Sequence, residues 1–208
     1  MVKASDFRAV FPGVDQKTPV YRHSHIQRNQ PVKGADASLM KFPPLLCEPC
    51  NNARTQPHDR AWEALVDRVL QTPTAWTSGS RLPIADAFGG AVRQSMLGIH
   101  LYFLKLLGCH ATQHSVPLPI GEFAEAIRKG VAHKDVRLRF YAAPSNAGRR
   151  RIIVGNIHLV QLEGATVAAT WSYVLGPLGV HIVFDNQGGY SRHLGWHPSD
   201  GIRRIRMR

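Results

Sequence analysis

Residues 46–62 read LCEPCNNARTQPHDRAW and carry the most informative pattern in this chain of 208 residues. Cys47 and Cys50 form a Cys-x-x-Cys pair, a spacing that lets one tight turn aim two sulfur atoms at the same zinc ion. The two asparagines that follow suit a turn, because asparagine tolerates left-handed backbone angles. An amphipathic helix is then expected from Pro57 onwards. The stretch therefore predicts a zinc knuckle that leads directly into a helix.

This combination resembles the zinc-knuckle type of the HNH endonuclease superfamily, and the resemblance covers roughly residues 3–70. It implies a ββα-metal module within residues 1–72. It also implies that nucleic acid is cut by metal-assisted phosphodiester hydrolysis, with Mg²⁺ or Mn²⁺ as the catalytic ion and Zn²⁺ as the structural ion. The expected partner is nucleic acid, with DNA ahead of RNA.

The chain departs from the family pattern at its beginning. The first Cys-x-x-Cys of the family is absent, and Asp6 stands where the family places its histidine general base. The ordinary pKa of an aspartate lies well below neutrality, so Asp6 is a weaker base than histidine. Two interpretations remain open: the chain is a late-started form of a longer protein, or His23 and His25 complete the zinc site.

The start of the expected helix holds two further candidates. His58 and Asp59 follow Cys50 by eight and nine residues, and either side chain is able to bind a divalent ion. The alternative for Asp59 is a structural role, because an acidic residue in the first turn of a helix is favoured by the helix dipole. Three residues are our candidates for catalysis: Asp6, His25 and His58. Six residues are our candidates for metal binding: Cys47, Cys50, His23, His25, His58 and Asp59.

The composition agrees with a polyanionic partner. Twenty-six Lys and Arg against fourteen Asp and Glu give a formal net charge of +12. Residues 1–75 contribute a net charge of +3 and the remainder contributes +9. Such a field attracts nucleic acid with a salt-dependent affinity, although a solvated turn and a solvated tail account nearly as well for each arginine cluster taken alone. Our candidates for nucleic-acid binding are all arginines: Arg54, Arg137, Arg139, Arg149, Arg150, Arg151, Arg203, Arg204 and Arg206.

The rest of the chain predicts a mixed α+β fold. A first helix is expected at 57–71, a linker at 72–86, and two more helices at about 87–107 and 120–129, the former ended by Gly108. Residues 1–45 indicate turns and short strands. Alternating apolar and polar residues then predict four strands that form an antiparallel meander packed on the two helices. The strands are expected at 136–140, 152–160, 166–175 and 180–184. Residues 87–208 would thus form a second, α+β domain.

Several classes of protein are disfavoured by simple counts. No stretch reaches the roughly twenty apolar residues of a membrane span. Asp6 and Arg8 interrupt any apolar leader, and three cysteines with two in a knuckle favour a reducing compartment, so we expect a cytoplasmic protein. Three hypotheses remain: a metal-dependent endonuclease, a degenerate module that binds nucleic acid without cutting it, and a structural or interaction domain.

Overall fold

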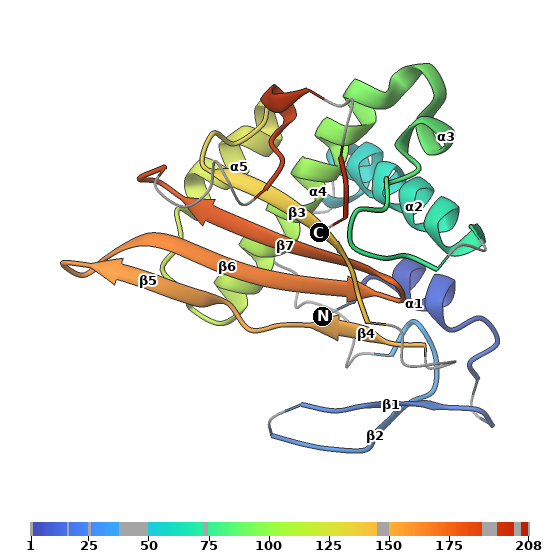
Figure 1. The fold of residues 1–208 in the computed structure, drawn as a ribbon. Coiled ribbons are helices and arrows are strands. Elements are labelled where there is room, and N and C mark those ends of the chain that lie inside the picture. Colours follow the sequence, from blue (N-terminus) through green and yellow to red (C-terminus); the bar gives the residue numbers. More distant parts are fainter. Residues whose placement is uncertain are drawn as a thin grey trace.

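The computed structural model describes residues 2–15, 17–24, 26–37, 50–72, 75–144, 150–188, 195–201 and 205–207. Figure 1 shows helices gathered against one side of an antiparallel sheet, so the predicted mixed α+β class is confirmed. The zinc knuckle stays a prediction, because Cys47 lies outside the described residues. Within the described ranges, no helix has the combination of length and apolar character needed to cross a membrane.

Helix α2 (Gln56–Gln71) confirms the first helix expected from the sequence. It follows a π-helical turn at Cys50–Arg54, and Pro57 lies in its first turn, where a missing backbone N–H costs nothing. Its buried stripe has the predicted helical spacing and packs into the main core. The residues of this stripe are Ala61, Trp62, Leu65, Val66 and Val69.

Helix α4 (Val92–Gln113) is the central helix of the layer, and both of its ends differ from the prediction. A short helix α3 (Ile84–Phe88) lies in the expected linker, and a 3-10 turn at Gly89–Ala91 separates it from α4. At the other end, α4 continues through Gly108. A glycine inside a helix costs only about 1 kcal/mol, and packing on the neighbouring helix offsets that cost.

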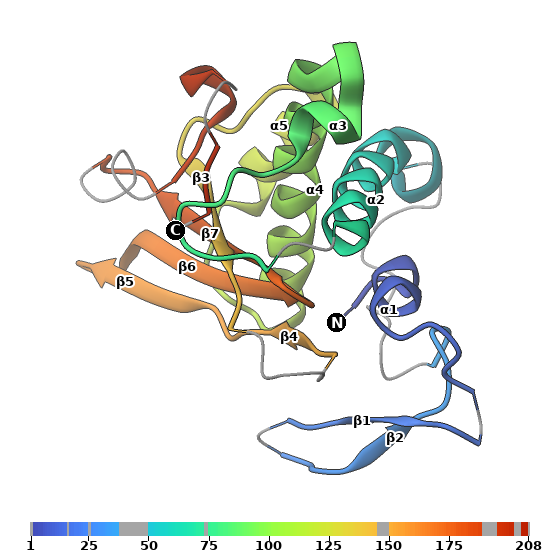
Figure 2. The ribbon, with the colours of Figure 1, turned by 45° about the vertical axis from the view of Figure 1, so that its right-hand side comes forward.

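Helix α5 (Ile120–Lys129) matches the third predicted helix. It ends at Gly130, whose left-handed backbone (φ 66°) is a conformation that glycine adopts without steric cost. The Phe123 ring of α5 lies beside Gly108 of α4. The helix layer therefore consists of α2 on α4 and of α4 on α5, as Figures 1 and 2 show.

The main sheet contains the predicted strands in an order that the sequence did not indicate. Its strands are β3 (Val136–Ala142), β4 (Ile152–Val154), β5 (His158–Leu162), β6 (Ala165–Leu175) and β7 (Leu178–Asp185). The order is β3-β7-β6-β4, and β5 pairs with the same strand β6 as β4 does. The expected strand 152–160 is thus divided in two, and the simple meander is wrong for β3, which pairs with β7 at the far edge.

The sheet has one apolar face and one mixed face. Leu138 and Phe140 of β3 are buried against the helix layer, whereas Arg137 and Arg139 point to the other side, as the alternation predicts. No described helix covers this second face in Figure 1. The arginines of β3 are therefore placed on the surface of the sheet.

The N-terminal part adds a helix that the sequence analysis missed. Helix α1 (Ala4–Val10) packs on α2, and its Phe7 packs with Val32 of the small hairpin β1 (Val20–Arg22) and β2 (Gln30–Val32). In Figures 1 and 2 the hairpin lies below α1 and away from α2. The predicted division at residues 72–87 stays a prediction, although Val10 and α2 share one core with the sheet.

Candidate functional site

Two short backbone pairings build a concave surface beside strand β3. Trp196 pairs with Leu138 through two hydrogen bonds of 2.9 and 2.7 Å, which extends the free edge of β3. Met207 pairs with residues 79 and 80 through two hydrogen bonds of 2.8 Å. These pairings hold the C-terminal segments in place on either side of a cavity.

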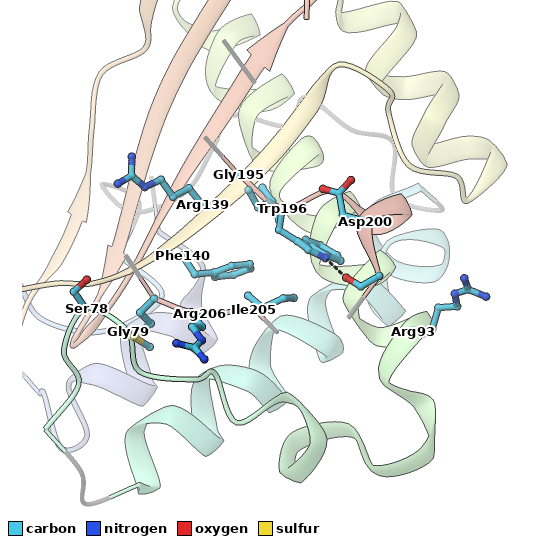
Figure 3. A pocket seen from close by; sticks show the side chains of 13 residues that line it. Ser78, Gly79, Arg93, Arg139, Phe140, Gly195, Trp196, Asp200, Ile205 and Arg206 are labelled. Atoms are coloured by element: carbon cyan, nitrogen blue, oxygen red, sulfur yellow. Dashed lines mark hydrogen bonds between the residues drawn. The ribbon is translucent and has the colours of Figure 1, made fainter. Parts of the chain in front are cut away.

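The cavity has a volume of about 1090 Å³ and an apolar floor with a basic rim. Phe140, Trp196 and Ile205 lie in the middle of the site in Figure 3. Arg139, Arg206 and Arg93 lie on three different sides of them, contributed by β3, the C-terminal segment and the first turn of α4. Residues that are more than forty positions apart in the chain therefore converge on one site.

The charge balance of the cavity is strongly positive. Asp200 carries the only carboxylate among the described lining residues, and it lies 2.6 Å from the guanidinium of Arg137 and accepts the backbone N–H of His197. The three rim arginines form no ion pair with any described carboxylate. In addition, the Nε of Arg139 is buried and has no hydrogen-bond partner among the described groups. A buried donor without a partner is costly.

Three buried histidines fix the segment that carries Trp196. The backbone N–H of His133 donates to Nε2 of His100, and Nε2 of His197 lies 3.2 Å from the carbonyl oxygen of His133. Burial, followed by the charges of His197 and His133, lowers the pKa of His100 to about 3. These rings are therefore neutral near pH 7 and act as a scaffold. Among the described residues, no group of three or more His, Cys, Asp or Glu is arranged to hold a metal ion.

The open face of the sheet continues the polar surface beyond Arg139. The ring of His181 stacks on Tyr141 at 4.7 Å, and its Nδ1 lies 2.7 Å from the hydroxyl of Ser172. Burial, and then the charge of Arg139, lowers the pKa of His181. The neighbourhood of Arg139 thus offers aromatic and hydroxyl groups without a negative charge.

A second polar cluster surrounds Asp6 in the centre of the molecule. The Asp6 side chain is 1% exposed and accepts three hydrogen bonds, from Trp62 Nε1 (3.0 Å), Tyr102 Oη (3.0 Å) and Tyr173 Oη (2.6 Å). Burial raises the pKa of Asp6 to about 6, and the tyrosine hydrogen bonds oppose this shift. Both carboxylate oxygens are occupied, which favours a structural role. A role for Asp6 as catalytic base stays a prediction.

The first turn of α2 places His58 and Asp59 in different surroundings. Asp59 lies 2.6 Å from the ammonium of the buried Lys105 and 3.6 Å from that of Lys3. It is therefore engaged in a partly buried ion-pair cluster. His58 is half-buried, and burial together with the charge of Lys105 lowers its pKa. The His58 ring is neutral near pH 7, the state that a base or a metal ligand requires.

The other predicted residues are spread over the molecule. His23 accepts the backbone N–H of Asn29 in the hairpin loop, and Arg54 is exposed beside α2. Arg150 is exposed, whereas the guanidinium of Arg151 donates to the carbonyl of Pro144. Only the backbone of Cys50 is described. Five candidates lie outside the described residues: His25, Cys47, Arg149, Arg203 and Arg204.

The structure thus brings together only part of the predicted set. Arg139 and Arg206 border the cavity, and Arg137 neutralises its carboxylate. Sequence reasoning missed Arg93 and Trp196, because nothing in their local spacing indicates that α4 and the C-terminal segment meet at β3. Comparisons with family models, curated proteins and solved structures found no match.

Proposed function

We propose that this protein binds nucleic acid and that the cavity beside β3 contacts the phosphate backbone. The observation that carries the proposal is the set of three arginines without described carboxylate partners around one open cavity. Arginine suits this task, because its planar guanidinium donates two parallel hydrogen bonds to a phosphate. The net charge of +12 adds long-range attraction of the same sign.

The neutralised carboxylate supports the same function. An uncompensated Asp200 at the cavity wall would repel phosphate, but its ion pair with Arg137 at 2.6 Å removes most of that repulsion. The site therefore combines fixed positive charge on its rim with a neutral wall. Incidental charge does not account for three arginines around one concavity that have no carboxylate partner among the described residues.

The test is a binding titration with the double variant Arg139→Ala/Arg206→Ala. We expect a loss of affinity for labelled oligonucleotides, and a decrease of about one in the salt slope for each phosphate contact removed. Fluorescence anisotropy at several salt concentrations measures both quantities. The matched control is Arg28→Ala/Arg128→Ala, which removes the same charge from the hairpin loop and from α5.

The control separates a site from a general charge effect. Equal losses in both double variants would show that the net charge alone attracts nucleic acid and that the cavity is not the interface. A complete absence of binding by the wild-type protein at low salt would contradict the proposed function itself.

Cleavage of the HNH type is our second candidate function. It is supported by the resemblance around Cys50 and by the neutral, half-buried His58 at the start of α2. If the protein is such an enzyme, His58 is the described residue best suited to hold a divalent ion or a proton. Asp59 is less suited, because two lysines already engage its carboxylate.

Plasmid nicking in the presence of Mn²⁺ tests this second candidate. We expect cleavage that EDTA abolishes and that His58→Ala reduces by roughly a hundredfold or more, the usual contribution of a general base. The exposed His158 of β5 provides the control variant His158→Ala. Folded wild-type protein that binds the plasmid without nicking it would refute the enzyme and leave the binding function in place.

A further inference from the structure

We propose that the cavity takes an unpaired nucleotide, so that the protein prefers single-stranded over double-stranded nucleic acid. This inference rests on the proposed binding function and names its substrate class. It places a base over the apolar floor and the flanking phosphates on the arginine rim. The argument depends on the shape of the site, on the fixed orientation of Trp196 and on the positions of the arginines.

The shape of the site fits a nucleotide that has left a helix. A volume of about 1090 Å³ is comparable with the larger pockets that bind small molecules. A duplex presents a convex backbone with its bases stacked inside, so a paired base has no access to the floor of this cavity. An unpaired base, in contrast, exposes both faces of its ring for stacking.

The floor of the cavity offers an aromatic surface in a fixed orientation. The half-buried Trp196 donates its indole N–H to the carbonyl of Gly201 at 2.8 Å, and its backbone pairs with Leu138 on β3. Because the donor of the indole is already used, the ring contributes its face and not a polar group. Phe140 and Ile205, both buried, lie beside the indole and support it from the hydrophobic core. Such a preordered ring loses little side-chain entropy when a base stacks on it.

The rim places positive charge where the backbone of a bound strand would enter and leave. Arg139 and Arg93 lie on different sides of the aromatic floor in Figure 3, and Arg206 lies below Phe140, next to Gly79. Gly79 and Gly201 leave open space beside their Cα atoms, so a sugar–phosphate chain is able to approach the wall closely. A single strand that crosses the cavity therefore meets a guanidinium on either side of the stacked base.

The experiment compares a single strand, the matching duplex, a mononucleotide and inorganic phosphate as ligands of the full chain. We expect the single strand to bind more tightly than the duplex, and Trp196→Ala to weaken single-strand binding by roughly tenfold or more. Trp196→Phe keeps an aromatic face and is expected to retain most of the affinity. Duplex binding, which uses the arginines alone, should change little in either variant.

Trp76 supplies the matched control. It is also half-buried, and its indole N–H also donates to a backbone carbonyl, that of Val69, but it does not line the cavity. Trp76→Ala should leave the preference for the single strand unchanged. Thermal unfolding of each variant shows that the proteins compared are folded.

The outcomes separate this inference from the function on which it rests. Equal affinity for single strand and duplex, with no effect of Trp196→Ala, would overturn the inference while the binding function stands. Tight binding of the mononucleotide with no gain from a longer strand would overturn it in favour of a free-nucleotide site. No binding of any nucleic acid would refute both proposals together.

Discussion

Asp6 shows how one residue can occupy the position of a motif and yet have different surroundings from those the motif implies. The family resemblance placed it at the position of a catalytic base. In the structure its carboxylate accepts hydrogen bonds from Trp62, Tyr102 and Tyr173, which belong to α2, α4 and β6. It thereby connects four elements at the centre of the molecule. No local pattern in residues 1–10 indicates these partners.

The buried Asp6 predicts a stability that depends on pH. Because burial raises the pKa of Asp6 from 3.8 to about 6, the folded state binds a proton that the unfolded state releases between these values. Stability should therefore fall as the pH rises from about 4 to about 6, by on the order of 3 kcal/mol for the shift as a whole. Urea unfolding of wild type and Asp6→Asn across this range measures the difference, since the amide does not titrate.

A second variant tests the same prediction by raising the pKa of Asp6 further. Tyr173→Phe removes a donor that stabilises the charged carboxylate, so the loss of stability should move to higher pH. A wild-type curve that runs parallel to that of Asp6→Asn from pH 4 to 7 would contradict the titration of Asp6 in the folded state.

Individual site residues were predictable only where charge and strand alternation identify them. Arg137 and Arg139 were expected on the exposed face of a strand, and the structure places them there. Trp196 and Arg93 could not be found this way, because their roles depend on contacts between distant segments. Candidates such as His25 and Arg203 lie outside the described residues, so their assignment stays a prediction.

At the scale of elements, helices were predictable where local signals agree. The periodicity of α2 predicted its bounds to within one residue, and the bounds predicted for α5 match the observed ones. For α4 the local signal was misleading. Gly108 is a common helix end in sequence terms, but the ring of Phe123 packs beside it and the helix continues for five further residues. Tertiary packing therefore outweighs the intrinsic preference of one glycine.

For the strands, too, the local sequence pattern predicts where each strand lies but not which strands pair. The strand pattern located the segments of the main sheet, with β4 and β5 joined as one strand, but the order of strands depends on which edges are free. The tight turn between β6 and β7 pairs these two strands, and β4 and β5 occupy the other edge of β6. Only the outer edge of β7 is left for β3, which explains why the expected meander fails there. Strand order therefore follows from competition for edges, which the sequence of one strand does not encode.

At the scale of the whole molecule, the sequence indicated a basic protein in two parts. The structure describes one hydrophobic core that includes Val10 of α1, Trp62 of α2, Phe103 of α4 and Tyr173 of β6. A core shared across residues 72–87 favours one folding unit, and the division there stays a prediction. The cavity beside β3 also extends beyond the predicted second domain, since residues 78 and 79 of the expected linker line it together with the C-terminal segment.

This arrangement predicts that the chain unfolds as one cooperative unit. Trp62 and Trp171 are both buried, and they lie on either side of the predicted domain boundary. Because they share one core, loss of structure around either ring should expose the other, which is the condition for a two-state transition.

Urea unfolding of Trp62→Phe and Trp171→Phe, each followed by tryptophan fluorescence and by far-UV circular dichroism, measures this coupling. The fluorescence and dichroism midpoints should coincide within each variant, even though each substitution lowers stability. Two separated transitions, with the Trp62 and Trp171 signals changing at different urea concentrations, would restore the two-domain interpretation and would place the boundary in the segment between α2 and α3.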